Sequence, residues 1–336
     1  MADTKISALP AVTTATATDE YATNQGGTSK KTTRSVLFTN PEFPGYYDLD
    51  SIATPSVPGA GVLRVWGRAT AGRMLLKWQG ASGLDTAAQP ALFGNNVVLF
   101  SPSSGTTVTN GFGLTWAKGS GAGTVSTPSI STGAPVYLNT MKRTRMANAV
   151  TTTNQQFGIV GTAGTAVQFW RGNAAGFGGF FFFTRFGLGA WLAGSRIFAG
   201  MAASATTPVV SDTLTNNCCG MSRLLADTGN TLSFVTRDAT TTNTIAISGA
   251  TIATGAIFDV YIFARPNDST IYFRVDQNDD GSGTNLGTLI DSSTSTNLPV
   301  NTTLLGADVT MSNGTANITA NTVFCDVNRI YVESDH

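Results

Sequence analysis

The sequence predicts an all-β fold, an antiparallel β-sandwich or jelly-roll body preceded by a short extended N-terminal anchor segment. Short runs rich in β-branched and aromatic residues recur from residue 61 onward, and each is bounded by Gly, Asn, Asp or Ser. This pattern is typical of strands separated by turns. No stretch of helical length carries an apolar stripe with a 3.6-residue period. The sequence shows no repeat of fixed length, which disfavours a propeller or a β-helix.

Composition divides the chain into three parts. Residues 1–40 are polar, rich in threonine and poor in aromatic side chains, so this segment cannot bury enough apolar surface to stay ordered alone. Residues 41–60 are punctuated by Pro and Gly and are predicted to form a linker. Residues 61–336 are predicted to form the sandwich. Its main strands are expected at 61–69, 96–100, 167–170, 180–186, 231–237, 257–266, 270–277 and 328–334.

The stretch AGFGGFFFFTRFGLGAWLAG at residues 175–194 contains four consecutive phenylalanines. A membrane-spanning helix needs about 20 predominantly apolar residues. Here Arg171, Arg185 and Arg196 interrupt the apolar region, and the glycines of the stretch weaken a helix. We therefore expect a strand and no membrane insertion.

As a strand, this stretch has aromatic side chains on both faces. Phe180, Phe182 and Phe186 share one face, and Phe181 and Phe183 share the other. The core of a sandwich covers only one face of each strand, so the second face needs further cover. That cover is either another part of the same chain or a neighbouring subunit. Under the second alternative, Phe181 and Phe183 lie in a subunit interface.

The balance of charge argues against a nucleic-acid partner. The chain has 20 basic and 20 acidic residues, and only 12% of its residues are charged. Nucleic-acid binders instead concentrate basic charge on one face to displace counterions. The one basic cluster, Lys142, Arg143 and Arg145, alternates like a strand with one solvated face. A neutral surface of low charge suits a protein that is packed against other copies or other subunits.

The cysteines and the N-terminus indicate the compartment. Cys218, Cys219 and Cys325 match neither a disulfide framework nor a metal-ligand spacing, and we expect buried free thiols. The first ten residues show no apolar region behind a basic start, as a signal peptide would. We therefore expect synthesis and assembly in a cytoplasm.

Residues for nucleophilic or acid–base catalysis are scarce. The one histidine is His336, and the sequence contains no nucleotide-binding loop or zinc signature. The chain is therefore not expected to be an enzyme. Paired carboxylates that hydrolyse a glycan are brought together only by the fold, so a glycan depolymerase stays an alternative.

The segment DQNDDG suggests a calcium loop. Asp276, Asn278 and Asp280 occupy the first, third and fifth positions of such a loop, and Gly281 occupies the sixth. The closing bidentate Glu is replaced by Gly287. A polar hairpin loop is the alternative, because Asn, Asp and Gly favour turns. Calcium is the only cofactor that the sequence suggests.

The segment FWRGNAAG places Trp170, Arg171 and Asn173 close together. An aromatic ring beside guanidinium and amide donors forms a candidate glycan contact. The alternative is that Trp170 packs in the core, because large aromatic side chains are mostly buried.

The segment TKISALPAVTTATATDEYATNQGGTSKKTT resembles the N-terminal attachment segment of many bacteriophage fibre and virion proteins. Those proteins begin with an I-S-x-L-P-A-like phrase, followed by D-E and then by Q-G-G-T-x-K-x-T. The phrases AGRMLLKWQGASGLDTAAQPALFGNN, FWRGNAAGFGGFFFFTRFGL, FARPNDSTIYFRV and RIYVESDH are similar to a widespread family of phage tail and fibre proteins. The docking segment that this resemblance implies includes Ile6, Leu9, Pro10, Gln25, Gly26, Gly27, Thr28 and Lys31.

The resemblance implies a virion structural protein, a homotrimer that is assembled in the cytoplasm of a bacterial host. Its N-terminus would dock onto a tail adaptor, a portal-proximal protein or a capsid protein. The C-terminal half, ending in CDVNRIYVES, is also similar to the closing strands of concanavalin-like sandwiches, which often bind carbohydrate. We therefore expect a tail fibre that contacts a host surface polysaccharide. A head fibre or capsid decoration protein without receptor function is a further alternative.

Overall fold

The structure is a computed structural model of two compact units, Met1–Asp50 and Ser51–His336. The boundary between them falls inside the segment that the sequence predicts as a linker. The described residues are 20–25, 28–33, 49–53, 55–70, 73–81, 96–102, 116–118, 122–131, 137–149, 152–161, 169–203, 213–224, 231–314 and 319–334.

The described part of the first unit is an antiparallel hairpin of β1 (Glu20–Gln25) and β2 (Thr28–Thr33). Three of the predicted docking residues, Gln25, Thr28 and Lys31, belong to this hairpin. The others lie outside the described residues, namely Ile6, Leu9, Pro10, Gly26 and Gly27.

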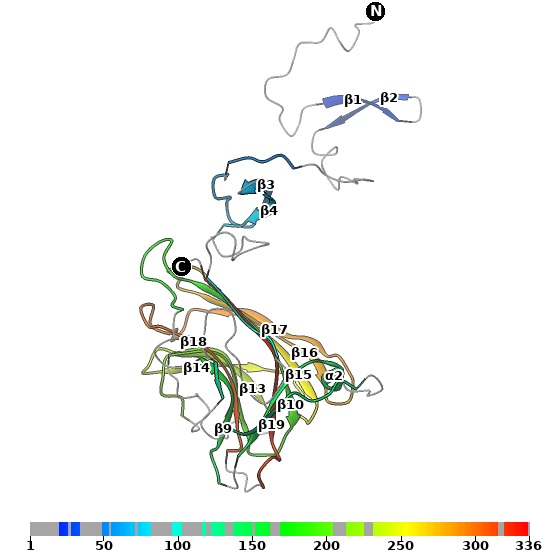
Figure 1. The fold of residues 1–336 in the computed structure, drawn as a ribbon. Coiled ribbons are helices and arrows are strands. Elements are labelled where there is room, and N and C mark those ends of the chain that lie inside the picture. Colours follow the sequence, from blue (N-terminus) through cyan, green and yellow to red (C-terminus); the bar gives the residue numbers. More distant parts are fainter. Residues whose placement is uncertain are drawn as a thin grey trace, which may run out of the picture. The chain divides into compact units, whose positions relative to one another are not determined.

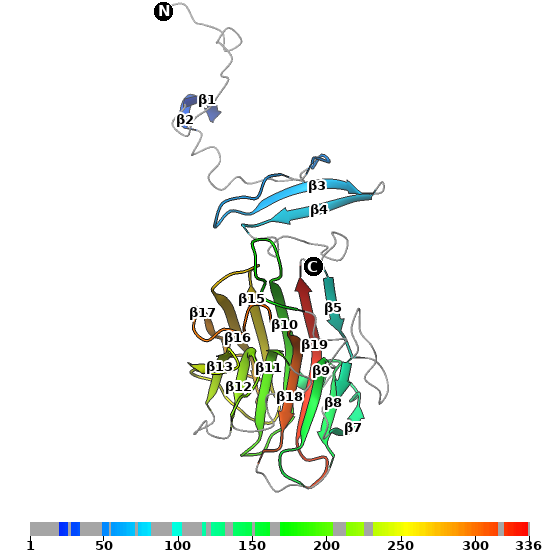
Figure 2. The ribbon, with the colours of Figure 1, turned by 90° about the vertical axis from the view of Figure 1, so that its left-hand side faces the viewer.

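The second unit begins with the antiparallel hairpin of β3 (Arg64–Thr70) and β4 (Arg73–Gln79). A sandwich of two antiparallel sheets follows, which confirms the predicted all-β class (Figures 1 and 2). A short helix, α2 (Tyr137–Thr140), interrupts the strands. No helix among the described residues is long and apolar enough to span a membrane.

Two sheets, here called sheet I and sheet II, make up the sandwich. In spatial order, the strands of sheet I are β17 (Gly287–Thr294), β16 (Ile271–Asp280), β15 (Ala256–Ala264), β10 (Phe180–Ala190), β19 (Phe324–Ser334), β8 (Thr144–Asn148) and β7 (Ala122–Ser126), and β5 (Asn96–Phe100) also pairs with β19. Those of sheet II are β14 (Thr242–Ile247), β13 (Leu232–Arg237), β12 (Cys218–Arg223), β11 (Arg196–Ala202), β18 (Gly306–Ser312), β9 (Gln156–Gly161) and β6 (Trp116–Lys118).

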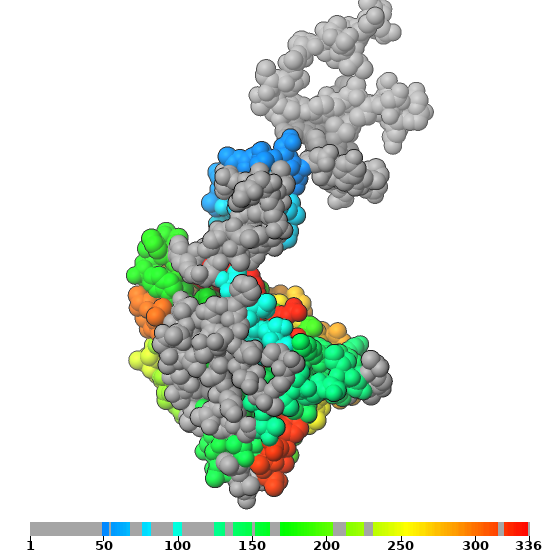
Figure 3. All heavy atoms as spheres, viewed as in Figure 1, coloured from blue at the N-terminus to red at the C-terminus, as the bar shows by residue number. Residues whose placement is uncertain are grey.

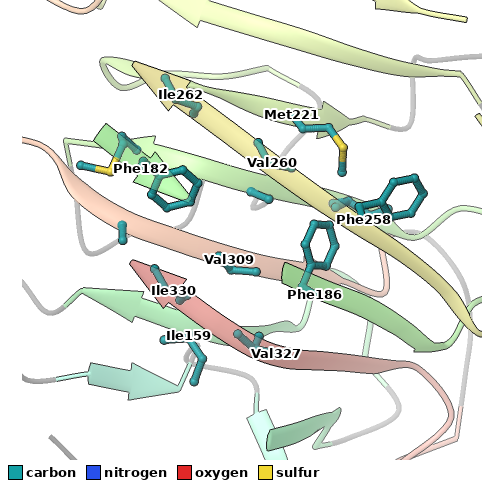
Figure 4. Close-up of a cluster of buried hydrophobic side chains, with 14 of the residues drawn as sticks. Ile159, Phe182, Phe186, Met221, Phe258, Val260, Ile262, Val309, Val327 and Ile330 are labelled. Carbon is teal, nitrogen blue, oxygen red and sulfur yellow. The ribbon is translucent and has the colours of Figure 1, made fainter. Parts of the chain in front are cut away.

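The core lies between the two sheets. Phe182 and Phe186 of β10 belong to a continuous cluster of buried side chains that also includes Phe258 of sheet I and Met221 of sheet II (Figure 4). Phe234 of β13 stacks on Phe273 of β16, with 3.7 Å between the ring centroids. These contacts remove large apolar areas from water, which is the dominant favourable contribution to folding.

The phenylalanine run forms the beginning of β10, at the centre of sheet I, so the predicted strand at 180–186 is confirmed. Its inward side chains are fully buried, whereas Phe181 and Phe183 on the outer face are half-buried. The predicted strand at 167–170 is wrong in its described part, because Phe169 forms only an isolated bridge with Leu305.

The basic cluster leads into β8, but its predicted solvated face is wrong. Lys142 is exposed, whereas Arg143 is buried and Arg145 is half-buried. Both arginines donate to the carboxylate of Asp326 on β19, at distances of 2.7–3.0 Å. Asp326 is fully buried, and a buried carboxylate requires charged partners.

The three cysteines are free and buried, as predicted. Burial raises the pKa of the Cys219 thiol to about 12. Its thiol therefore stays protonated at neutral pH, and a protonated thiol is a poor nucleophile. These residues behave as small apolar side chains of the core and of the outer face of sheet II.

Candidate functional site

A polar pocket lies where three loops of the sandwich meet. The first loop leads into β10, the second joins β15 to β16, and the third joins β17 to β18. The backbone amide of Gly172 donates to the carbonyl of Asn301 at 3.1 Å, and that of Asn267 donates to the carbonyl of Arg171 at 2.8 Å. These bonds join the first loop to each of the other two.

Glycine allows the first loop to fold back on itself. Gly172 has a φ of +93°, and a Cβ atom there would lie 1.7 Å from the carbonyl oxygen of Phe177. Gly178, with a φ of +75°, would place a Cβ atom 2.5 Å from the amide nitrogen of Gly172. Any side chain at these two positions would therefore displace the loop.

Arg171 is the centre of this arrangement. Its side chain is only 7% exposed. Nη1 donates to the carbonyl of Pro299 at 2.9 Å, and Nη2 donates to the carbonyl of Asp268. Burial lowers the pKa of the guanidinium, and the nearby carboxylate of Asp268 partly opposes this effect. The Arg171 side chain thus connects the second loop to the third.

The donor set of Arg171 is not fully used. Its Nε is buried and has no hydrogen-bond acceptor among the described residues. A buried polar group without a partner costs about 1–3 kcal/mol. The cost is offset when a ligand or water in the adjoining pocket supplies an acceptor.

The pocket has a volume of about 350 Å³, which falls within the range of small-molecule sites. Its lining consists of Arg171, Asn267, Asp268, Ser269, Ser295, Leu298 and Asn301. Amide and hydroxyl groups both donate and accept, the carboxylate accepts, and the guanidinium donates. A ligand with many neutral hydroxyl groups, each also able to donate and accept, matches this mixture.

Only one of the predicted glycan residues reaches this pocket. Arg171 lines it, whereas Trp170 is half-buried and Asn173 is exposed, and neither belongs to the lining. The glycan contact of Trp170 and Asn173 stays a prediction that lies outside this pocket. The other polar lining residues lie in turn-like segments such as PNDS and STSTN, which carried no signal of a shared site in the sequence.

The outer face of sheet I carries a second feature, an aromatic face. It consists of Phe181, Phe183, Tyr261, Phe263, Tyr272 and Tyr331, all half-buried. The rings of Phe181 and Phe263 meet edge to face at 6.5 Å, and those of Phe183 and Tyr261 are 4.8 Å apart. Cross-strand pairing of β10 with β15 aligns these rings.

A row of charges borders the aromatic face. Asp259 accepts two bonds from Arg185, at 2.6 and 2.5 Å, and Asp276 accepts from Arg274 at 2.8 Å. The bond to Asp259 raises the pKa of Arg185. Asp259 and Asp276 are direct cross-strand neighbours. They are adjacent carboxylates of the kind that the depolymerase alternative needs, but each is held by an arginine.

The structure does not assemble the predicted calcium loop. Asp276, Asn278 and Asp280 lie along β16 and not in a loop, and alternate residues of a strand are about 6.6 Å apart. Asp280 caps the following turn by accepting from the amide and hydroxyl of Ser282. Among the described residues no group of three or more His, Cys, Asp or Glu could hold a metal ion.

Comparison with known proteins yields remote structural likenesses. No family model matches the chain, and no curated protein matches it. Peanut lectin, solved with a nine-residue peptide, is 9% identical with a TM-score of 0.43, over 71% of this chain and 97% of the lectin. Lectin II from Ulex europaeus is 13% identical with a TM-score of 0.40, and the match covers 71% of this chain and 98% of the lectin.

A third solved structure is the CBM2 module of the evolved Dit of Lactobacillus casei BL23 phage J-1. It is 10% identical with a TM-score of 0.28, and the match covers 71% of this chain and 89% of the module. All three TM-scores lie below 0.5, so the fold of this chain is described from its own strand order and registers.

Proposed function

We propose that the chain is a bacteriophage virion structural protein, a homotrimeric tail fibre that contacts a host surface polysaccharide. The N-terminal phrase around ISALPA and QGGTSKKT supports the virion role and a docking function for residues 1–40. The single observation that carries the glycan contact is the pocket around Arg171. Its neutral and charged hydrogen-bonding groups surround a volume of about 350 Å³.

Each pocket would bind weakly, because its polar groups exchange bonds with water for bonds with sugar hydroxyls. A trimer presents three such pockets to a repeating polysaccharide. After the first pocket binds, the others meet their ligand at a high effective concentration, so overall affinity rises by about 10²–10⁴-fold. The half-buried aromatic face supports the trimer as a candidate subunit interface.

The glycan contact is tested with the purified full chain and isolated host surface polysaccharide. We expect saturable binding in biolayer interferometry that falls at least tenfold in Asp268→Ala and in Asn301→Ala. Both side chains line the pocket, and the Arg171 bridge uses the backbone carbonyl of Asp268, which Asp268→Ala keeps. Asp291→Ala removes an exposed carboxylate outside the pocket and serves as the matched control. Equal binding by all four proteins would refute the assignment.

The virion role is tested by removing the gene from the phage. Loss of adsorption with intact particles supports the tail fibre. Unstable particles with normal adsorption would point to a head fibre or capsid decoration protein. Release of reducing sugar from the host polysaccharide by the purified chain would point to the depolymerase.

A further inference from the structure

A second pocket lies on the outer face of sheet I, beside α2. It has a volume of about 330 Å³ and is lined by Tyr137, Met141, Arg185, Ile257, Asn278 and Asn285. In Figure 1, α2 lies next to β15 and β16, and in Figure 3 the segment around it forms part of the surface. The Arg171 pocket lies at the opposite ends of these strands, by the loop that joins β15 to β16.

One buried carboxylate holds the walls of this pocket in place. Asp279 accepts from the amide of Tyr137 at 2.8 Å with Oδ2, and from Gly281 and Gly283 at 2.8 and 2.9 Å with Oδ1. It therefore ties α2 to the turn after β16. Leu138 packs so closely on β10 that a Cβ atom at Gly187 would lie 2.5 Å from its Cδ1.

The pocket contains a polar donor without a partner. Nδ2 of Asn278 is buried and has no hydrogen-bond acceptor in the part of the chain that the structure describes. Arg185 uses Nε and Nη2 on Asp259. An unpaired buried amide opposes folding, and a ligand carbonyl at this position would remove that cost.

The surrounding charges favour a neutral ligand. Arg185 is the one charged residue of the lining, and it is already paired with Asp259. The lining therefore offers an anion such as a uronic acid no unpaired cation. Beside the amides of Asn278 and Asn285, the lining contains Met141, the buried Ile257 and Tyr137, which is 53% exposed.

We propose that this pocket binds a neutral sugar that carries an acetamido group. The acetamido carbonyl accepts from Nδ2 of Asn278, and its methyl group packs against Ile257 and Met141. The C–H face of the pyranose ring lies against the ring of Tyr137. A plain hexose has the ring but lacks both the carbonyl and the methyl. The proposal does not depend on the Arg171 pocket.

The direct test is saturation-transfer NMR on the full chain, with N-acetylglucosamine and N-acetylgalactosamine as probes and glucose and glucuronic acid as comparisons. We expect saturable binding of at least one acetamido sugar, with the strongest transfer to its methyl protons. The binding that Asn278→Ala removes should be at least tenfold weaker for glucose and glucuronic acid. Equal binding of glucose that Asn278→Ala also removes, or no binding of either acetamido sugar, would overturn the proposal.

Two variants separate binding from folding. Asn278→Ala removes the unpaired donor, so we expect at least a tenfold loss of acetamido-sugar affinity and an unchanged or higher urea midpoint. Tyr137→Ala removes an exposed ring and should weaken binding several-fold without unfolding the protein. Ser293→Ala, an exposed position on β17 that lines neither pocket, is the matched control and should bind the probe normally. Unchanged affinity in Asn278→Ala, or a lowered urea midpoint, would show that Asn278 serves the fold instead.

Discussion

The outer faces of the two sheets differ in what covers them. On sheet II, Phe198, Cys218 and Val235 form a second buried cluster together with Leu214 from the connection before β12. On sheet I, the aromatic face is only half-buried. Both faces arise from the same alternation of side chains along a strand. The difference lies in the connections that cover them.

The outer face of sheet II therefore contributes to stability, whereas the outer face of sheet I is the one available for recognition. The covered face of sheet II adds a second core to the first. The outer face of sheet I is buried beside Asp326 and α2, and elsewhere it leaves aromatic rings, ion pairs and a pocket accessible. A ligand or a second subunit therefore has more to contact on sheet I. The following predictions test this contrast, from the largest effect to the smallest.

On the outer face of sheet I, substitution of the buried Asp326 should cause the largest loss of stability. Asp326→Ala leaves Arg143 and Arg145 without their shared carboxylate, one of them in a fully buried position. We expect a loss of about 3–5 kcal/mol in the free energy of unfolding, since an unpaired buried charge is costly. Urea denaturation measures it. The exposed Asp291→Ala should change stability by less than about 0.5 kcal/mol; similar losses for both would contradict the assignment.

The two faces of β10 should respond differently to truncation. Phe182 is fully buried between the sheets, and Phe182→Ala should cost about 3–4 kcal/mol through lost burial and a cavity. Phe183→Ala on the outer face should cost about 1 kcal/mol, because the ring is already partly hydrated. Thermal and urea unfolding measure both. Equal costs would mean that the outer face is covered as completely as the core.

Burial on the outer face of sheet II should make the stability of the protein depend on pH. Asp308 is fully buried on β18, and burial raises its pKa from 3.8 to about 7. Below pH 3.8 both states hold the proton. As pH rises from about 4 to 7, only the unfolded state loses it, so stability falls by about 1.4 kcal/mol per pH unit from this group. Above pH 7 the contribution is constant.

Asp308→Asn should remove this part of the pH dependence, because the amide stays neutral. The difference in urea midpoint between the two proteins, measured from pH 4 to pH 8, isolates the contribution of this carboxyl. We expect the variant to gain relative to the parent as pH rises. A difference in urea midpoint that does not change from pH 4 to pH 8 would mean that the Asp308 carboxyl is ionised over this whole range, with water reaching its Oδ2.

The smallest effect on folding is expected from Phe181→Ser and Phe183→Ser, measured by analytical ultracentrifugation. If the aromatic face is the subunit interface, these variants should yield folded monomers where the parent chain is a trimer. Unfolding of the monomer itself would instead show that the face belongs to the core. Ser293→Ala, an exposed position on β17, is the control and should leave the oligomeric state of the parent chain unchanged.

Strand prediction succeeded for several runs of large side chains and missed other strands, among them three that mix glycine or cysteine with larger residues. The runs at 96–100 and 231–237 correspond closely to β5 and β13. The strands RIFAGMA, CCGMSR and GADVTMS were not predicted. At their pairing, Gly200 faces Gly220, and a Cβ atom at Gly200 would lie 2.2 Å from the carbonyl oxygen of Cys219. Glycine at these positions allows the two strands to approach closely. In the sequence alone, the same glycines indicate a turn.

The sequence by itself determined the β class, the two-faced character of the phenylalanine strand and the burial of the thiols. These properties follow from local periodicity and from the apolar character of single residues. The tertiary structure alone decided that Arg171 meets Asp268 and Asn301, that Asp276 pairs with Arg274 in place of a calcium ion, and that Asn278 lines a pocket beside α2. Such contacts join residues far apart in the chain, and the order and register of the strands, set by burial of the whole core, determine which loops meet.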